Sequence, residues 1–353
     1  MEEATRMTLV CDDVYSYVQG LFRSGLVIVV GSGASCAYGL PSMGTLAEQL
    51  IEEVPSWTLQ PDSISVWDRI VDRLTNGDDL ETALGPDVIP EDLAEVVTGV
   101  ISNIVGGAEA PAIEKILTAT TESALGRLFK HALRATNYID VITTNYDRLL
   151  EIHAARADVR VDTMFYGHTI GRLDPKLSKE ELLTSSGTPG RGRSTRTTAR
   201  PHIRLSKPHG SLDWYAGAGT YFRTDLVVSS SKQIIAPGGN KYRLGYGIPF
   251  EAQRGRANAA VTNSSAMLFI GYGFNDEHLQ THLKPKMSQV PSVLVAKKLT
   301  DSAHEYLKLN SMAIGIEEDP ATGGCTATRN GESLIIAHPL WDIESLSTEV
   351  LGI

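Results

Sequence analysis

Four short stretches of this 353-residue chain deliver polar or glycine residues directly after a predicted strand. They are VIVVGSGAS (Val27–Ser35), VITTNYD (Val141–Asp147), LSKPHG (Leu205–Gly210) and LFIGYGFND (Leu268–Asp276). Short, continuous apolar runs predict strands that are buried on both faces, as in a parallel sheet. Open α/β sheets bind their ligands at the carboxyl ends of the strands. We therefore expect the four turns to face one crevice.

The first glycine turn suits a phosphate group. Gly31, Gly33, Ala34 and Ser35 follow a buried strand, where glycine lets backbone N–H groups approach a pyrophosphate closely. The pattern is incomplete, because Cys36 stands where a dinucleotide-binding loop has its third glycine. A tight structural turn between a strand and a helix is the alternative interpretation.

The second glycine turn repeats this arrangement. Gly271, Gly273 and Asn275 follow another buried strand, and two such turns could hold the two ends of a dinucleotide. Asn275 or Asp276 could instead serve only as the N-cap of the next helix.

Asn145, Asp147 and His209 are the side chains that could carry chemistry. Near a glycosidic bond, Asn145 and Asp147 suit a ligand with an amide, such as the carboxamide of nicotinamide. His209 reaches out from a strand end as a potential base. Each has a structural alternative, since Asp147 could cap the next helix and a single histidine is more often a hydrogen-bonding group. We expect catalysis only if His209 and Asn145 meet at one ligand.

The order of the elements predicts an open, mostly parallel α/β sheet. Residues 55–134 have helical periodicity, which indicates a helical module inserted between two core strands. Residues 183–204 mix arginine with Gly, Ser, Thr and Pro, a composition that predicts a mobile loop. This basic loop could contact a partner or phosphates, and a solvated insertion is the simpler alternative.

Composition excludes several classes of function. The net charge of −10 argues against a general nucleic-acid binder or a protein of the membrane surface. The three cysteines are far apart and cannot form a four-cysteine zinc site, so we expect no metal and a reducing cytoplasm. The first residues lack the apolar core of a signal peptide, and no membrane helix is expected.

The blocks GSGAS, TTNYD, KPHGS and GYGFND, in this order, resemble the sirtuin superfamily. The resemblance is closest to the zinc-free branch found in bacterial anti-phage defence. It implies that residues 1–353 form one Rossmann-like domain that binds NAD and breaks the nicotinamide–ribose bond. The chain departs from protein-deacylating sirtuins because it lacks their zinc ribbon and carries Thr144 where they have glutamine.

The resemblance also implies roles for the candidate residues. Gly31, Gly33, Ala34 and Ser35 would hold the phosphates, and Gly271 and Asn275 would lie near the adenosine half. Asn145 would act at the nicotinamide ribose, and Asp147 would hold the carboxamide. His209 would contact the ribose hydroxyls as a base.

An NAD⁺ hydrolase that depletes NAD during abortive infection is the first hypothesis. The departures from the deacylases favour water as the acceptor, and NAD is then the substrate rather than a resident cofactor. The resemblance further implies self-assembly and a partner of the HerA-type ring ATPase kind. The alternatives are a deacylase or ADP-ribosyltransferase with the same site, or a non-enzymatic sensor of NAD or ADP-ribose. A dehydrogenase is a fourth option, weakened by the missing third glycine.

Overall fold

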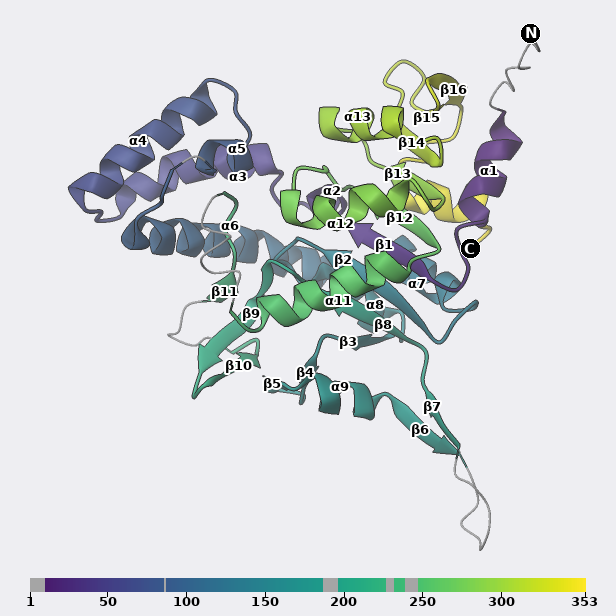
Figure 1. The fold of residues 1–353 in the computed structure, drawn as a ribbon, viewed down its shortest axis with the longest axis horizontal. Coiled ribbons are helices and arrows are strands. Elements are labelled where there is room, and N and C mark those ends of the chain that lie inside the picture. The colour runs from purple at the N-terminus through teal and green to yellow at the C-terminus, as the bar shows by residue number, and fades with distance from the viewer. Residues whose placement is uncertain (1–9, 86, 187–195, 227–231, 239–246) are drawn as a thin grey trace, which may run out of the picture.

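A nine-stranded sheet forms the centre of the molecule, in the order β16-β15-β14-β13-β12-β1-β2-β8-β3 (Figure 1). The computed structural model describes residues 10–85, 87–186, 196–226, 232–238 and 247–353. Neighbouring strands from β14 to β3 pair in parallel. Strands β15 and β16 pair antiparallel and lie at one edge of the sheet. The predicted mostly parallel α/β fold is therefore confirmed. The strands are β1 (Leu26–Val30), β2 (Tyr138–Thr143), β3 (Arg160–Asp162), β8 (His202–Ser206), β12 (Ala266–Ile270), β13 (Ser292–Val295), β14 (Ala313–Glu318), β15 (Cys325–Arg329) and β16 (Glu332–Ile336).

The central strands are apolar along their whole length, and their register brings their carboxyl ends together. Every residue of β1 and β12 is buried, as expected for strands covered on both faces. Val30 pairs with Ile270 on one side and with Thr143 on the other. Ile142 in turn pairs with Ser206. The four turns noted in the sequence therefore leave the sheet side by side, at the carboxyl ends of its central strands.

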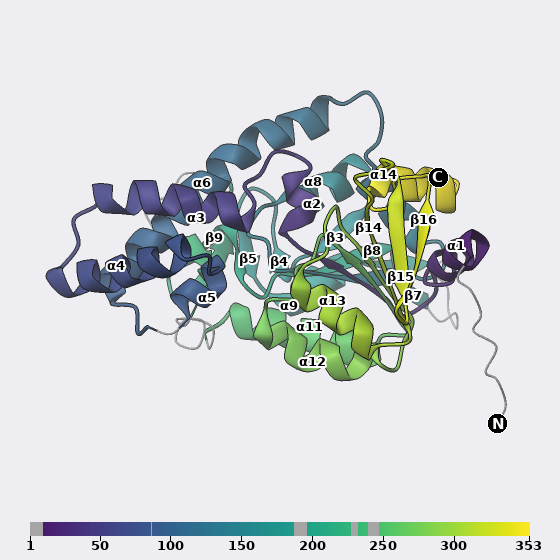
Figure 2. The same cartoon turned by 90° about the horizontal axis from the view of Figure 1, so that it is seen from above.

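Helices cover both faces of this sheet (Figure 2). One face packs against the first helix and against helices that follow β2 and the last strand, and the other face packs against helices flanking β12 and β13. The covering helices are α1 (Cys11–Gln19), α7 (Ala124–Ala132), α8 (Leu149–Arg156), α14 (Ile343–Ser345) and the π-helix η2 (Leu346–Val350) on one face, and α11 (Phe250–Asn263), α12 (Glu277–Met287) and α13 (Asp301–Leu309) on the other. Capping residues begin several of them; for example, Thr300 Oγ1 accepts the N–H of Ala303 at the start of α13.

A separate helical body lies between β1 and β2. It has a core of its own, to which Leu50, Trp67, Ile70, Leu93 and Ile101 contribute. After the short α2 (Ser32–Cys36), its elements are α3 (Met43–Glu53), the 3₁₀ helix η1 (Val54–Ser56), α4 (Pro61–Thr75), α5 (Leu80–Leu84) and α6 (Glu91–Thr118). Helix α7 packs on the sheet instead, because its apolar face meets the strands. We call residues 43–118 the helical module, which is shorter at its C-terminal end than the predicted 55–134.

Helix α6 is the one described helix that is long and apolar enough, by length and composition, to cross a membrane. Val97, Val100 and Ile101 of this helix are buried in the core of the module. Near its other end, Glu109 is 1% exposed and binds Arg148, which follows β2. Packing in the core of the module therefore accounts for the apolar residues of α6.

A smaller antiparallel sheet was not anticipated from the sequence. Its order is β11-β9-β10-β5-β4. Strands β4 and β5 precede β8 in the chain, and β9, β10 and β11 follow it. These strands are β4 (Phe165–Tyr166), β5 (Gly171–Leu173), β9 (Gly210–Gly217), β10 (Thr220–Arg223) and β11 (Lys232–Ile234), with α9 (Pro175–Glu181) following β5. Apart from the eight-residue β9, they are only two to four residues long, so the sequence pattern of each of these is weak.

Strands form at both ends of the predicted loop over residues 183–204. Its ends pair as an antiparallel hairpin of β6 (Leu183–Ser186) and β7 (Arg196–Ala199), which projects from the body in Figure 1. The β-branched Thr184, Thr197 and Thr198 favour this pairing. Residues 187–195, with Arg191 and Arg193, lie outside the described residues.

Burial of His153 makes the stability of the fold depend on pH. Its side chain is fully buried in α8, with Nδ1 2.7 Å from Ser123 Oγ. Burial lowers the pKa of His153 from 6.5 to about 4. The unfolded chain therefore binds more protons between these two pH values, and stability falls as the pH drops from about 6.5 toward 4.

We expect His153→Gln to remove this pH dependence. Between pH 7 and pH 5, the wild type should lose on the order of 2 kcal/mol more unfolding free energy than the variant. Urea unfolding at the two pH values measures the difference. His338→Gln is the matched control, because the side chain of His338 is half exposed, and it should lose as much as the wild type. Equal losses in all three proteins would contradict the assignment.

Candidate functional site

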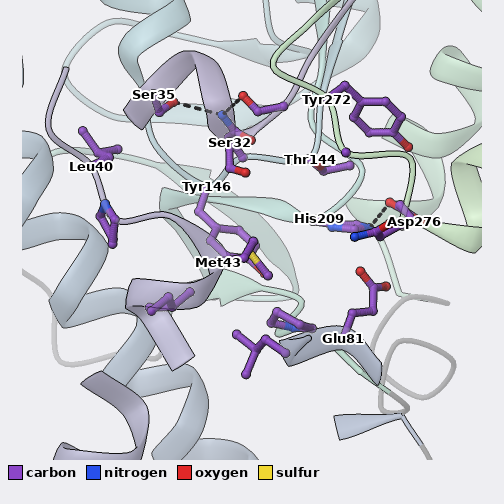
Figure 3. Close-up of a pocket in the computed structure, with 18 of the residues that line it drawn as sticks. Ser32, Ser35, Leu40, Met43, Glu81, Thr144, Tyr146, His209, Tyr272 and Asp276 are labelled. Atoms are coloured by element: carbon purple, nitrogen blue, oxygen red, sulfur yellow. Dashed lines mark hydrogen bonds and ion pairs between the residues drawn. The ribbon is translucent and has the colours of Figure 1, made fainter. Parts of the chain in front are cut away.

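One pocket lies where the four turns meet at the carboxyl edge of the sheet (Figure 3). The turns contribute one wall, with Gly31, Ser35, Asn145, Asp147, His209 and Asn275 among its residues. The opposite wall comes from the helical module and the segment that leads into it, through Leu40, Met43, Leu46, Asp79, Glu81 and Val105. The pocket thus lies between two bodies that have separate cores.

The pocket encloses about 150 Å³, and a second cavity of about 550 Å³ adjoins it. Typical ligand sites measure roughly 300–1,000 Å³, so a ligand as large as a dinucleotide would extend out of the first pocket. Asp79, Glu81, Phe274 and Asn275 line both cavities. The second cavity continues between α12 and α13.

A backbone contact fastens the turn after β1 to the turn after β12. A Cβ on Gly31 would overlap the carbonyl oxygen of Gly271, and one on Gly33 would lie 2.9 Å from Gly271 Cα. The N–H of Gly33 donates to the carbonyl of Gly271 over 3.0 Å. Gly271 has a φ of +57°, in the left-handed region that glycine adopts without penalty. Glycine is therefore required at these positions by close approach and backbone conformation.

Ser35 links Asn145 to Asp147 through a short chain of hydrogen bonds. Asn145 Nδ2 donates to Ser35 Oγ (2.9 Å) and to the carbonyl of Gly31 (3.1 Å). Ser35 Oγ donates in turn to Asp147 Oδ2 over 2.8 Å. Because both donors of the Asn145 amide group are directed at these acceptors, its Oδ1 is left to accept a bond from a ligand.

Asp147 is buried and also holds the start of the next helix. It is 5% exposed, and its Oδ1 accepts the N–H of Leu149 over 3.1 Å. Burial raises the pKa of the Asp147 carboxyl above its ordinary value, against the opposing charge of Lys207. Asp147 thus lines the pocket and binds the first residue of α8, although the N-cap of that helix is Arg148.

His209 pairs with Asp276 at one side of the pocket. His209 Nε2 lies 2.9 Å from Asp276 Oδ2, and both side chains are largely buried (Figure 3). Asp276 Oδ1 also accepts the N–H of Leu279, at the start of α12, over 3.3 Å. Burial, and then the charge of Asp276, raise the pKa values of Tyr146 and Tyr272. A carboxylate in this position fixes the orientation of an imidazole and which of its ring nitrogens carries the proton.

The predicted site residues fall into two groups. The first group lines the pocket and consists of Gly31, Ser35, Asn145, Asp147, His209 and Asn275. The second group, Gly33, Ala34 and Gly271, lies in the backbone contact between the two glycine turns. The N–H of Ala34 donates to the carbonyl of Gly31 over 3.1 Å, and that of Gly33 is engaged as described above. Phosphate binding by these two amides stays a prediction.

Sequence reasoning missed Asp276 as the partner of His209 and missed the wall from the module. Asp276 lies in the block GYGFND, where it was considered only as a helix cap, so its signal was present in the sequence. Glu81 and Met43 carry no such signal, because their places in the pocket depend on how the module packs. Figure 3 shows Glu81 reaching toward the side of the pocket where His209 and Asp276 lie.

Over the described ranges, no group of three or more His, Cys, Asp or Glu side chains is arranged to hold a metal ion. The cysteines in these ranges, Cys11, Cys36 and Cys325, are unpaired.

Comparison with known families identifies a SIR2-like domain over residues 140–305. This range covers just under half of the chain and includes Asn145, His209, Gly271 and Asn275. The match supports a place for the chain in the sirtuin-like superfamily. No curated protein sequence matches the chain.

Comparison with solved structures finds sirtuins. One, described as "Structural Basis for the Mechanism and Regulation of Sir2 Enzymes", has a TM-score of 0.45 and 11% identity, covering 97% of this chain and 99% of the other. Another, described as "The Structural basis of Sirtuin Substrate Affinity", has a TM-score of 0.39 and 13% identity over 81% and 88% of the two chains. A third, a Sir2 protein with a deacetylated p53 peptide and 3'-O-acetyl ADP ribose, has a TM-score of 0.38 and 12% identity over 83% and 89%.

The glycine contact makes a direct prediction about the site. Gly271→Ala should destabilise the protein by about 1–3 kcal/mol and displace both glycine turns, because the new Cβ meets the Ala34 amide and φ is positive. Gly273→Ala is the matched control, since its Cβ would meet nothing closer than 3.6 Å. Thermal and urea unfolding of both variants measure the difference. A Gly271→Ala protein as stable as the Gly273→Ala protein would show that the contact is not a constraint.

Proposed function

We propose that this protein is an NAD⁺ hydrolase, which cleaves the bond between nicotinamide and ribose to give nicotinamide and ADP-ribose. The observation that carries the proposal is the meeting of Asn145, Asp147 and His209 at one pocket. The SIR2-like match over residues 140–305 supports use of NAD by the same pocket.

The charge of the pocket favours a cationic ligand. Asp79, Glu81, Asp147 and Asp276 line it, and none of the described lining residues is lysine or arginine. The nicotinamide ring of NAD⁺ carries a positive charge, and cleavage transfers that charge to the ribose as an oxocarbenium-like centre. Carboxylates that surround this centre stabilise both the bound cation and the developing one. These carboxylates would repel a pyrophosphate, so the proposal puts the phosphates of the dinucleotide outside the first pocket and leaves Gly31 and Ser35, which line it, without the phosphate contacts that the resemblance implied.

The reaction needs no acid to release nicotinamide, because the pyridinium leaves as a neutral molecule. Asp147 would accept a hydrogen bond from the carboxamide N–H₂ of nicotinamide. The Oδ1 of Asn145 would orient the attacking water or a ribose hydroxyl, since its Nδ2 is held by Gly31 and Ser35. Water adds its oxygen to the ribose carbon as the carbon–nitrogen bond breaks, and its proton passes to a base.

His209 is the group placed to act as that base. With Nε2 turned toward Asp276, the second ring nitrogen is the one that would accept the proton. The resulting imidazolium is stabilised by Asp276. The proton then passes to solvent, so that NAD⁺ and water give nicotinamide, ADP-ribose and one proton.

The remainder of the dinucleotide would pass Phe274 and Asn275 into the adjoining cavity. Both residues line the two cavities, and Asn275 offers an amide for hydrogen bonding. This path assigns the adenosine half to the side of Gly271 and Asn275.

The cellular role we propose is depletion of NAD in defence against phage, with cytoplasmic location. The support is the resemblance of the four sequence blocks to the zinc-free defence branch. Such an activity has to be restrained until infection, which favours a homo-oligomer and a ring ATPase partner. Co-purification with an ATPase encoded beside this gene, followed by measurement of cellular NAD after infection, tests this role.

Substitution of the two central side chains tests the activity. Asn145→Ala and His209→Ala should each lower kcat by about 10²–10⁴-fold, because positioning and base catalysis typically contribute factors of this size. Chromatography of the products from purified protein, alone and with any ring ATPase encoded beside this gene, measures NAD loss, nicotinamide and ADP-ribose. Asn263→Ala is the matched control, because Asn263 lies exposed at the end of α11, and it should retain full activity.

The same assay separates the alternatives. Product formation that requires an acylated peptide or a protein acceptor would replace the hydrolase with a deacylase or an ADP-ribosyltransferase. NAD that binds and is never cleaved would indicate a sensor. Full activity in both Asn145→Ala and His209→Ala would refute the site.

A separate prediction concerns the partner of His209. Asp276→Asn keeps the shape of the side chain but removes its charge, so kcat should fall by about 10- to 100-fold while the protein remains folded. Steady-state kinetics measure this effect against the wild type. An unchanged kcat would mean that Asp276 serves only to cap α12.

A further inference from the structure

Lys207 lies behind the pocket and is almost completely shielded from solvent. Its side chain is 1% exposed. Its Nζ donates to the carbonyl of Asp147 (2.5 Å) and to Ser211 Oγ (2.9 Å), and it lies 3.5 Å from Glu151 Oε1. Lysine is rarely buried to this degree, because removing an ammonium group from water is costly unless it is paired. The site therefore contains a buried cation to which the chemistry above gives no role.

The contacts of Lys207 join two of the functional turns. Lys207 stands two residues before His209 on the turn after β8, whereas the carbonyl that it binds belongs to the turn that carries Asn145 and Asp147. The same junction is completed from the β8 side, because Ser211 Oγ and the N–H of Leu212 both donate to the carbonyl of Tyr146, over 3.2 Å and 3.1 Å. Lys207 Nζ lies 3.4 Å from that carbonyl as well.

Lys207 also supplies positive charge to a group of buried carboxylates. Glu151 is in direct contact with it, and Asp147 and Asp213 lie within the range of its field. Burial alone would raise the pKa of Asp213, and the charges of Arg223 and Lys207 outweigh burial, so that this pKa lies below its ordinary value. For Asp147, burial dominates and the pKa is raised in spite of Lys207. Without Lys207, the neutral form of Asp147 would be favoured further.

We propose that Lys207 is a positioning residue of the site, which holds the Asn145–Asp147 turn and the His209 turn in register. The proposal rests on the proposed function of the pocket and assigns to it the residue that aligns its two halves. Lys207 contacts carbonyl oxygens and carboxylates behind the pocket and is not among the residues that line it. It therefore acts through Asn145, Asp147 and His209 rather than on the substrate.

Lys207→Met tests this role, because methionine is unbranched like lysine and lacks the charge and donors. We expect kcat for NAD cleavage to fall by at least about 30-fold, with a smaller change in KM, as for interactions that matter most in the transition state. Lys232→Met is the matched control. Lys232 is a half-buried lysine on β11 whose pKa is lowered by burial, and no described contact joins it to the two turns. Its kcat should stay within twofold of the wild type.

The pH dependence of kcat/KM is a second measurement, and a loss of packing alone would not change it. The charged and titratable groups facing Asp147 are Lys207, Glu109 and Cys36. Loss of the Lys207 charge removes the one cation among them and raises the pKa of Asp147. Because the ionised carboxylate is the form that accepts the carboxamide, the acidic limb of kcat/KM should move to higher pH in Lys207→Met. Lys232→Met should keep the wild-type limb.

Hydrogen–deuterium exchange tests the positioning without relying on catalysis. In Lys207→Met, exchange should increase in peptides covering residues 141–150 and 205–213 and stay unchanged in peptides covering β12 and the helical module. If the wild type cleaves no NAD, the proposed function fails, and this local increase still decides the role of Lys207. An increase spread over the whole sheet would reduce Lys207 to a general stabilising residue and overturn the proposal.

The remaining outcomes are also decisive. Wild-type kcat and pH profile in a folded Lys207→Met protein would overturn the proposal. If Lys207→Met does not fold, Ser211→Ala takes its place, because it removes one acceptor of Lys207 and one bond to the Tyr146 carbonyl. Ser211→Ala should then lower kcat by about 3- to 10-fold. An unchanged kcat in that variant would overturn the proposal.

Discussion

The site depends on a contact between two stretches of backbone that leaves no space for a side chain. Gly31 and Gly33 meet Gly271 at the ends of β1 and β12, and the strands are held in register behind them. The carbonyl of Gly31 then accepts the amide of Asn145, which extends the arrangement to β2 on the other side of β1. One close approach thus fixes three neighbouring turns, and only residues without a Cβ permit it.

Ion pairs with largely buried carboxylates join the turns of the site to the elements around them. Arg148 directly follows the Asn145–Asp147 turn and binds Glu109 of α6, which ties the turn to the helical module. Arg223 binds Asp213 and lies 3.7 Å from Glu151, which ties β9 and β10 to α8. Buried ion pairs contribute little net stability, but removing one partner is strongly destabilising. Their effect here is to restrict the arrangements that the turns can adopt.

Much of this arrangement follows from local sequence pattern, and some of it does not. The apolar runs of β1, β2 and β12 predicted a mostly parallel sheet, because a strand buried on both faces has a distinctive composition. The meeting of Asn145 and His209 followed from the rule that parallel strands end at one edge. The Glu81 wall and the pairing of His209 with Asp276 did not, because they depend on packing between segments far apart in the chain. The small antiparallel sheet was missed because most of its strands have too few residues for a clear pattern.

The two walls of the pocket belong to bodies with separate hydrophobic cores. The candidate catalytic side chains and most of the residues that shape the opposite wall consequently lie in different parts of the chain. Substitutions around Leu50, Trp67 and Ile70 would reshape the wall that carries Met43 and Glu81, although Tyr146 and Leu149, beside Asn145 and Asp147, pack against the same core. A protein built in this way can change which molecule it admits while its reaction stays the same, so the module is the part in which relatives with different ligands would diverge first.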